Sequence, residues 1–146
     1  MKKTILTTLA FLVACSVVSS CQAKDKVIQI KDLPQVAQTF VSTHFSDKEV
    51  SLVIKDGNEY EVRFVNGWEV DFDKKGEWEK VDCQNDSVPC SVIGIVPESI
   101  PAYLDENFEK AFVTEIGKEH NGYDIELSNG IGVDFSLKGQ FKRIDD

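Results

Sequence analysis

Two stretches of the sequence, NGWEVDFDKKGEWEKVD from Asn66 to Asp82 and NGIGVDFSLKGQFKRID from Asn129 to Asp145, share one pattern without a gap. Each contains an Asn-Gly pair, then Val-Asp-Phe, then Lys-Gly and a closing aspartate, and the offset between them is 63 positions (129 − 66). The same offset relates residues 33–82 to residues 96–145 throughout. A fixed offset over so long a stretch indicates a duplicated structural unit.

Each unit opens with a helical pattern. In the first unit, apolar residues from Leu33 to Phe45 recur at steps of three and four, with Asp32 as the expected N-cap and Pro34 in the first turn. In the second unit, Pro101 would interrupt the equivalent helix. We therefore expect a shorter second helix, over about 99–108.

The apolar period then changes from helical to two, which is typical of strands with one buried face. The alternation stays in phase across Asn66-Gly67 only if the turn has three residues, which sets Phe64 opposite Trp68 and gives Gly67 a positive φ. The same reasoning places Gly76, Gly130 and Gly139 in equivalent turns. The strands are expected at 49–55, 59–65, 68–74, 77–83, 111–118, 122–128, 131–137 and 140–145, with a bulge in the fifth of these.

The first residues have the features of an export signal. Two lysines precede an apolar run at 5–18, which is too short for a comfortable membrane span. Two endings stay open, lipid attachment at Cys21 or cleavage after Ala23. A lipid at Cys15 is rejected, because it would leave an odd number of cysteines in an oxidising compartment. We expect an exported chain, either periplasmic or lipid-anchored in the cell envelope through Cys21.

The remaining chain is long enough for one domain with a real core. We divide the sequence into a signal peptide (1–23), a lead-in (24–32), repeat 1 (33–83), an inter-repeat crossover (84–95) and repeat 2 (96–146). Removal of the signal peptide leaves 14 basic and 25 acidic residues, a net charge of 14 − 25 = −11. That sign argues against nucleic acid or an anionic membrane surface as a partner.

Cys83 and Cys90 follow the last strand of the first unit. In an oxidising compartment, two nearby cysteines are typical of a structural disulfide. We therefore expect a Cys83–Cys90 bond across the start of the crossover, and no redox motif supports a catalytic role for the pair.

The run GEWEKVDC at 76–83, the following VPESIPAYL at 96–104, the two meanders and the export signal resemble the PepSY-like family of exported bacterial proteins. This family shares the fold of the beta-lactamase inhibitor protein. The resemblance implies an α+β fold in which a helix plus a four-stranded antiparallel meander is duplicated in tandem, forming one curved eight-stranded sheet with the helices on one face. The named inhibitor binds its target enzyme with the concave sheet face, and its contact residues do not transfer to this sequence.

No catalytic motif is visible in the sequence. His44 lies on the expected first helix and His120 in a turn, and neither forms a recognisable arrangement with a serine or cysteine nucleophile. The sequence also lacks a glycine-rich phosphate loop and the C-x-x-C and H-E-x-x-H motifs. We expect no enzymatic activity, no cofactor and no metal centre.

The sheet face away from the helices is the candidate binding surface. The alternation places Glu61 opposite Asp71 and Asp124 opposite Asp134, and like charges opposite one another destabilise a sheet. We expect Glu61, Asp71 and Glu79 to form a row without a cation, and Lys142 to neutralise Asp134. The expected residues of this face are Glu61, Arg63, Glu69, Asp71, Glu79, Asp124, Glu126, Asp134 and Lys142.

The sequence thus predicts an exported, non-catalytic binding module whose open acidic sheet face engages a basic patch of a partner protein, in the manner of an inhibitor. The alternatives are a small-ligand or cation-binding envelope protein and a structural envelope component. A solvated acidic face without a binding role is the competing interpretation of the same charges.

Overall fold

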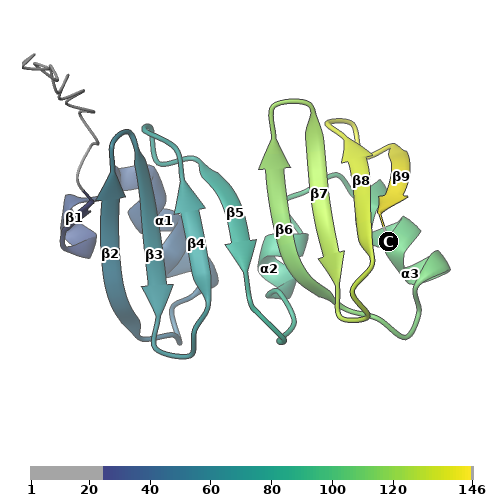
Figure 1. Ribbon diagram of the computed structural model, residues 1–146, viewed down its shortest axis with the longest axis horizontal. Coiled ribbons are helices and arrows are strands. Elements are labelled where there is room, and N and C mark those ends of the chain that lie inside the picture. Colours follow the sequence, from purple (N-terminus) through teal and green to yellow (C-terminus); the bar gives the residue numbers. More distant parts are fainter. Residues whose placement is uncertain (1–24, 146) are drawn as a thin grey trace, which may run out of the picture.

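The computed structural model describes residues 25–145 and shows an α+β protein with one antiparallel sheet of nine strands, ordered as in the sequence from β1 to β9 (Figure 1). The predicted signal peptide, with Cys15 and Cys21, lies outside the described residues. The elements are β1 (Lys26–Val27), a 3-10 helix η1 (Ile30–Asp32), α1 (Gln35–His44), β2 (Val50–Asp56), β3 (Glu59–Phe64), β4 (Glu69–Phe72), β5 (Trp78–Asp82), α2 (Cys90–Ile93), α3 (Ser99–Asn107), β6 (Val113–Glu119), β7 (Gly122–Leu127), β8 (Gly132–Ser136) and β9 (Phe141–Asp145).

The prediction of eight strands is wrong by one, because the lead-in contributes β1. Lys26 pairs with Lys55 and Val27 with Ile54, so β1 covers part of the β2 edge. The N-cap prediction is also wrong. Asp32 ends η1, where its carboxylate accepts a hydrogen bond from the Gln29 amide at 3.0 Å, and Pro34 is the N-cap of α1.

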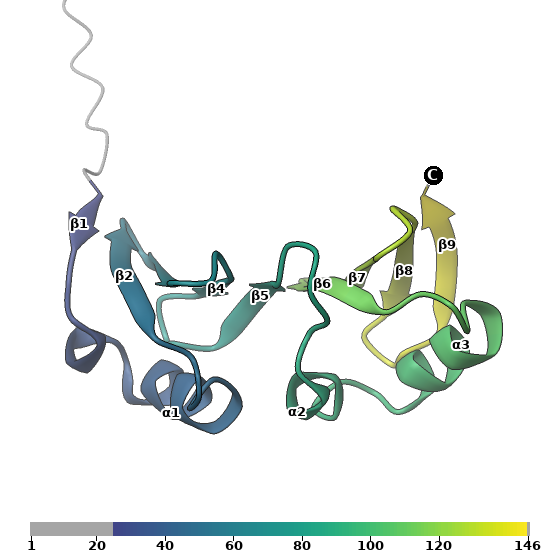
Figure 2. The ribbon, with the colours of Figure 1, turned by 90° about the horizontal axis from the view of Figure 1, so that it is seen from below.

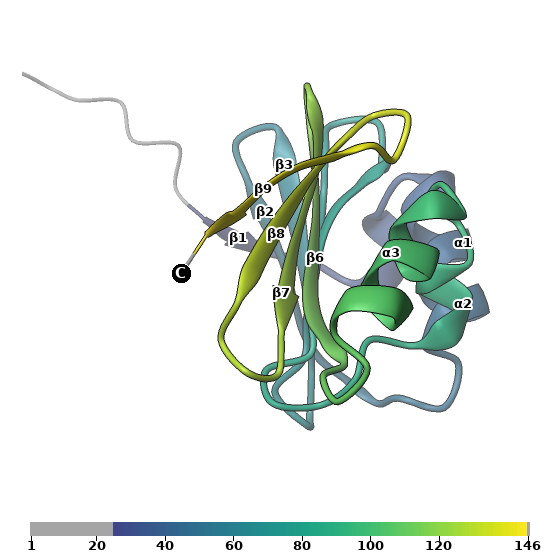
Figure 3. The ribbon, with the colours of Figure 1, turned by 90° about the vertical axis from the view of Figure 1, so that its right-hand side faces the viewer.

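All the helices lie on one face of the sheet, and the outer strands curve away from them (Figures 2 and 3). The other face of the sheet is therefore concave and uncovered. None of the helices between residues 25 and 145 is long and apolar enough to cross a membrane.

The core lies between the helices and the sheet, and residues 63 apart occupy equivalent places in it. Phe40 of α1 contacts Phe72 edge-on, with ring centroids 5.6 Å apart, and Tyr103 of α3 contacts Phe135 in the same way at 5.5 Å. Both Phe72 and Phe135 are fully buried. Each sheet half is thus held to its own helix by the same aromatic contact, which adds about 1 kcal/mol to the burial of the rings.

The turn prediction is confirmed. The Phe64 amide donates to the Trp68 carbonyl at 2.9 Å, and β3 pairs with β4 so that Val62 faces Val70. Gly67 has a φ of +88°. Positive φ also occurs at Gly76, Gly130 and Gly139, as the pattern predicts.

The glycines at 67 and 76 differ in their surroundings, which gives a test of the fold. A Cβ at Gly67 would meet no atom within 4 Å, whereas a Cβ at Gly76 would lie 2.7 Å from Pro34 Cβ and 3.0 Å from the Ala37 amide nitrogen. Gly67→Ala should therefore lower the free energy of unfolding only by backbone strain, about 1 kcal/mol. Gly76→Ala should lower it further, because α1 must shift. Denaturant titration of both variants measures the difference, and equal losses would show that α1 does not pack on this turn.

Candidate functional site

The uncovered concave face is crossed by two rows of side chains, each running from strand to strand through the register pairs. Valines and isoleucines that alternate with these residues, such as Val62 and Val133, are fully buried against the helices. We call the uncovered surface the open acidic face and define it by its two rows. The first row reads Glu61, Asp71, Lys80, Gly117, Asp124, Asp134 and Arg143. The second row reads Arg63, Glu69, Asp82, Glu115, Glu126, Gly132 and Asp145.

The structure confirms the two predicted pairs of like charges. Glu61 faces Asp71 across β3 and β4, and Asp124 faces Asp134 across β7 and β8. The first row therefore has the order acid, acid, base in each half of the sheet, with Gly117 between the halves. Because Gly117 has no side chain, the row is interrupted at its centre.

The predicted partners in the last strand of each half are wrong by one residue. A β-bulge shifts the register between Asp71 and Phe72, so that Asp71 faces Lys80 and Glu79 is the extra residue. The equivalent bulge makes Asp134 face Arg143 in place of Lys142. Lys142 instead donates to the Asn121 carbonyl at 3.3 Å. The bulges thus bring a cation to each acid pair where the simple alternation predicted none or the wrong one.

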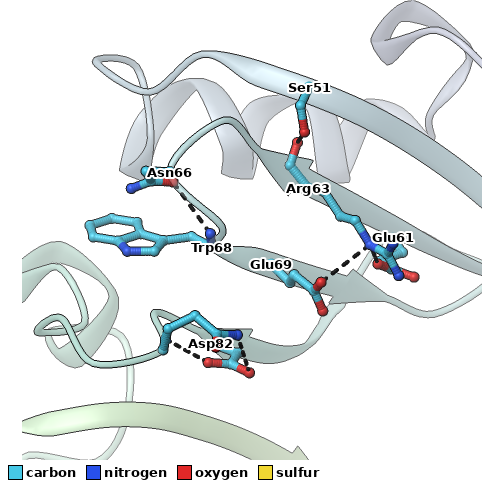
Figure 4. A network of polar contacts seen from close by, with 8 residues as sticks. Ser51, Glu61, Arg63, Asn66, Trp68, Glu69 and Asp82 are labelled. Atoms are coloured by element: carbon cyan, nitrogen blue, oxygen red, sulfur yellow. Dashed lines mark hydrogen bonds and ion pairs between the residues drawn. The ribbon is translucent and has the colours of Figure 1, made fainter.

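The cations of the face are all engaged by carboxylates. Figure 4 shows Arg63 directed at Glu61 and Glu69, with which it forms ion pairs, the latter at 3.2 Å. Lys80 Nζ lies 3.0 Å from Glu115 Oε2, which joins β5 to β6. In the second half, Arg143 contacts Asp134 at 2.6 Å and Asp145 at 3.1 Å.

Carboxylates outnumber these cations, and burial acts against the charged state of several acids. Burial, with the nearby charge of Glu61, raises the pKa of Asp71 to about 6. Burial and the facing Asp134 raise the pKa of Asp124, and burial raises that of Glu115. Burial alone would lower the pKa of Lys80, but its hydrogen bond to Glu115 and the surrounding carboxylates raise it. The free face therefore holds negative charge that the fold does not fully neutralise.

A small pocket opens at the hairpin end of each acid pair, and the two pockets are built from equivalent residues. Each is bordered by an acid pair, the tyrosine next to it and the base that follows the bulge. The first pocket is lined by Asp56, Glu59, Tyr60, Glu61, Asp71, Glu79 and Lys80. The second includes the residues 63 positions later, Glu119, Gly122, Tyr123, Asp124, Asp134, Lys142 and Arg143. Glu79 and Lys142 thus border the pockets without belonging to the rows.

The arrangement is suited to binding cationic groups. Within residues 25–145, no group of three or more His, Cys, Asp or Glu side chains is placed to hold a metal ion. His44 lies beside Phe40, with ring centroids 4.5 Å apart, and His120 is exposed. Carboxylates held in rows at fixed spacing are suited to recognising lysine and arginine side chains.

The predicted disulfide between Cys83 and Cys90 is wrong, since both cysteines are free. Cys83 continues β5, where its amide donates to the Thr114 carbonyl at 2.9 Å and its side chain is fully buried in the core. Cys90 is the exposed first residue of α2. The two side chains therefore lie in different environments, one under the sheet and one in solvent.

The two thiols should differ sharply in reactivity. Burial, with the charge of Asp82, raises the pKa of the Cys83 thiol to about 12, so Cys83 is both shielded and protonated. We expect a thiol reagent to label Cys90 at once without a reductant, and Cys83 only after unfolding. Mass spectrometry of the labelled peptides distinguishes the two thiols. If Cys90 were labelled only after a reductant is added, the protein would contain the predicted Cys83–Cys90 disulfide after all.

The raised pKa of Asp71 predicts a pH-dependent gain from Asp71→Asn. The folded protein keeps the Asp71 proton at pH values where the unfolded chain, with a pKa near 3.8, has lost it. The contribution of Asp71 to the free energy of unfolding therefore falls as pH rises from about 4 through about 6. Removing the charge should raise the free energy of unfolding at pH 7 by about 1 kcal/mol, discounted for screening by solvent.

The matched control is Asp105→Asn, which removes the same charge from an exposed position on α3, on the helix side of the sheet. The gain at pH 7 should be specific to Asp71→Asn. Denaturant titrations at pH 4 and pH 7 give the comparison. A loss of stability in Asp71→Asn at pH 7 would mean that the carboxylate is fully compensated by Lys80, contrary to the raised pKa.

Three of the solved structures that are similar to this chain cover 84% of it. The first is a "putative calcium-regulated periplasmic protein" from Bacteroides thetaiotaomicron, at 41% identity and a TM-score of 0.79, covering 84% of this chain and 97% of that one. Two proteins of Bacteroides vulgatus, both described as putative periplasmic proteins, match at 37% identity with a TM-score of 0.78 and at 33% with 0.77. These cover 84% of this chain and 97% and 100% of their own chains. No curated protein matches the chain.

Residues 19–70 and 58–143 match the model of a protein family described as "putative beta-lactamase-inhibitor-like, PepSY-like". The two matched segments together span nearly all of the described residues. The description refers to inhibitor-like proteins and names no enzymatic activity. The resemblance that the repeated meanders indicated is therefore confirmed, and the chain belongs to this PepSY-like, beta-lactamase-inhibitor-like family.

Proposed function

We propose that this chain is an exported, non-catalytic binding module whose open acidic face docks a basic patch of a partner protein, in the manner of an inhibitor. The observation that carries the proposal is the acid, acid, base order that occurs twice along the first row. Glu61 with Asp71, and Asp124 with Asp134, are held opposite one another although like charges repel. A lysine or arginine arriving at either pair relieves that repulsion.

The energetics of the face favour a cationic partner. Asp71 and Asp124 are partly desolvated in the free protein, which is the reason for their raised pKa values. Part of the desolvation that binding normally requires has therefore already occurred on folding. The sheet is concave on this side (Figure 2), and Gly117 contributes no side chain between the two acid pairs.

Export is the second part of the proposal. The lysines at the start of the chain, the apolar run at 5–18 and the small residues before Ala23 are those of a signal peptide. The relatives from Bacteroides are described as periplasmic, which supports the same location for this chain. Cleavage after Ala23 and lipid attachment at Cys21 both deliver the face to the cell envelope.

Calcium binding is the second candidate, favoured by the description of the 41%-identical relative as calcium-regulated. Calcium takes six to eight oxygen ligands, usually from a loop that wraps the ion. The acid pairs here lie on strands, and within the described residues no group of three or more His, Cys, Asp or Glu side chains is placed to hold a metal ion. We therefore rank protein binding first.

Photo-crosslinking in the native envelope tests the proposal. A photoreactive residue in place of Glu126, which is exposed on the second row, should give a discrete protein adduct. The same residue in place of Glu106 on the helix side should not. Asp71→Asn combined with Asp124→Asn should reduce the adduct about tenfold, and added salt should reduce it further, because rim charges govern such encounters.

Several outcomes would contradict the proposal. Equal adducts from the positions of Glu106 and Glu126 would place the partner elsewhere. An adduct of unchanged yield in the double variant would show that the acid pairs do not contribute to binding the partner. An adduct that disappears on calcium chelation and returns with calcium would favour the second candidate. Asp105→Asn serves as the charge control and should leave the adduct unchanged.

A further inference from the structure

Within the described residues, no strand pairs with the outer edge of β9, the last strand of the sheet. The strand equivalent to β9 in the first half of the sheet is β5, and β5 is covered by β6. Trp78 and Val81 of β5 are 8% and 0% exposed, whereas their equivalents in β9, Phe141 and Ile144, are 43% and 44% exposed. The same apolar pattern is thus buried by a neighbouring strand at one position and left in solvent at the other.

The pairing of β5 with β6 shows what such an edge accepts. Only the residues after the bulge take part, with Lys80 facing Gly117, Val81 facing Ile116 and Asp82 facing Glu115. On the helix side Val81 packs against Ile116, and on the open side Lys80 bonds to Glu115. The outer edge of β5 therefore pairs with an antiparallel strand that carries an apolar residue on the helix side and, next to it, a carboxylate on the open side.

The backbone of Ile144 is directed outward. In the first half, the Cys83 amide donates to the Thr114 carbonyl of β6 at 2.9 Å. Antiparallel bonding alternates along a strand, so Val81, two residues earlier, also presents its amide and carbonyl to β6. Ile144 is the equivalent of Val81, and its amide and carbonyl point away from β8. They are free to pair with another strand.

The sequence around Ile144 is complementary to itself. When two β9 strands pair antiparallel about Ile144, each Arg143 faces an Asp145 of the other copy on the open side, and the two isoleucines meet on the helix side. Opposite charges that face one another across strands stabilise the pairing, and so does contact between β-branched residues. The second copy thus supplies the apolar residue and the carboxylate that β6 supplies to β5.

We propose that two copies of this chain associate through β9, antiparallel and about a two-fold axis at Ile144, so that their sheets join into one. Such an interface is isologous and closes on itself. It also removes the exposed edge that would otherwise remain open to unspecific strand pairing. At the opposite edge of the sheet, β1 pairs with Ile54 and Lys55 of β2 and so covers part of that edge.

A single cysteine on the axis tests the proposal. Residues that exchange both backbone bonds in an antiparallel pair have Cα atoms about 5.5 Å apart, which is within the range of a disulfide. Ile144→Cys should therefore give a disulfide-linked dimer on mild oxidation of the purified protein. The same protein should carry Cys90→Ser, and serine in place of Cys15 or Cys21 where the purified chain contains them. The buried Cys83 can stay, because a thiol in the core does not form a disulfide with a second copy.

The control is Val36→Cys in the same chain, since Val36 on α1 is exposed to a similar extent, 48%. Ile144→Cys should cross-link about tenfold faster than Val36→Cys, because pairing raises the effective concentration of the two thiols. Equal rates would overturn the proposal. In the protein without the introduced cysteines, analytical ultracentrifugation should show a dimer. Ile144→Lys should abolish this dimer and Val36→Lys should preserve it, and circular dichroism should show that both variants are folded. A monomer at every concentration would also overturn it.

Discussion

The continuity of the sheet depends on the pairing of β5 with β6. This pairing contains only three residue pairs, yet it joins the two halves into one surface. Val81 and Ile116 are both fully buried at this point, and the crossover supports them from below with Val88 and Val92, which are 2% and 0% exposed. Lys80 and Glu115 close the same junction on the open side. Without this contact the rows of the open acidic face would end at β5, and each half would be a marginal unit.

The register of the hairpins could be read from the sequence because two independent constraints agree there. The alternation of apolar and charged residues sets which side chains share a face, and the glycine after each asparagine sets the length of the turn. Only a three-residue turn satisfies both, and the structure has Val62 opposite Val70 accordingly. Strand β1 could not be read in this way, since two residues are too few to show an alternation. It is held by register with β2 and by a bond from the Ile28 amide to the Val53 carbonyl.

The bulges in β5 and β9 could have been predicted from the spacing of apolar residues in these strands. Trp78 and Val81 are both apolar but stand three positions apart, as do Phe141 and Ile144. Residues an odd number apart point to opposite faces of a regular strand, so both members of such a pair can face the core only if one extra residue is inserted. Glu79 and Lys142 are those extra residues. The same spacing occurs in β6, where Val113 and Ile116 are three apart; it predicts a bulge, and β6 has one.

The bulge also decides the charge of the candidate site. A regular β5 would set Glu79 beside Asp71 and leave three carboxylates in a row, whereas the bulged strand brings Lys80 there. Lys80, however, hydrogen-bonds to Glu115 across the junction, so one ammonium group serves carboxylates on two different strands. Burial and the charge of Glu61 hold the pKa of Asp71 at about 6 although a cation faces it. The ion pairs compensate only part of the negative charge of the face, and the basic partner that we propose would pair with the charge that remains.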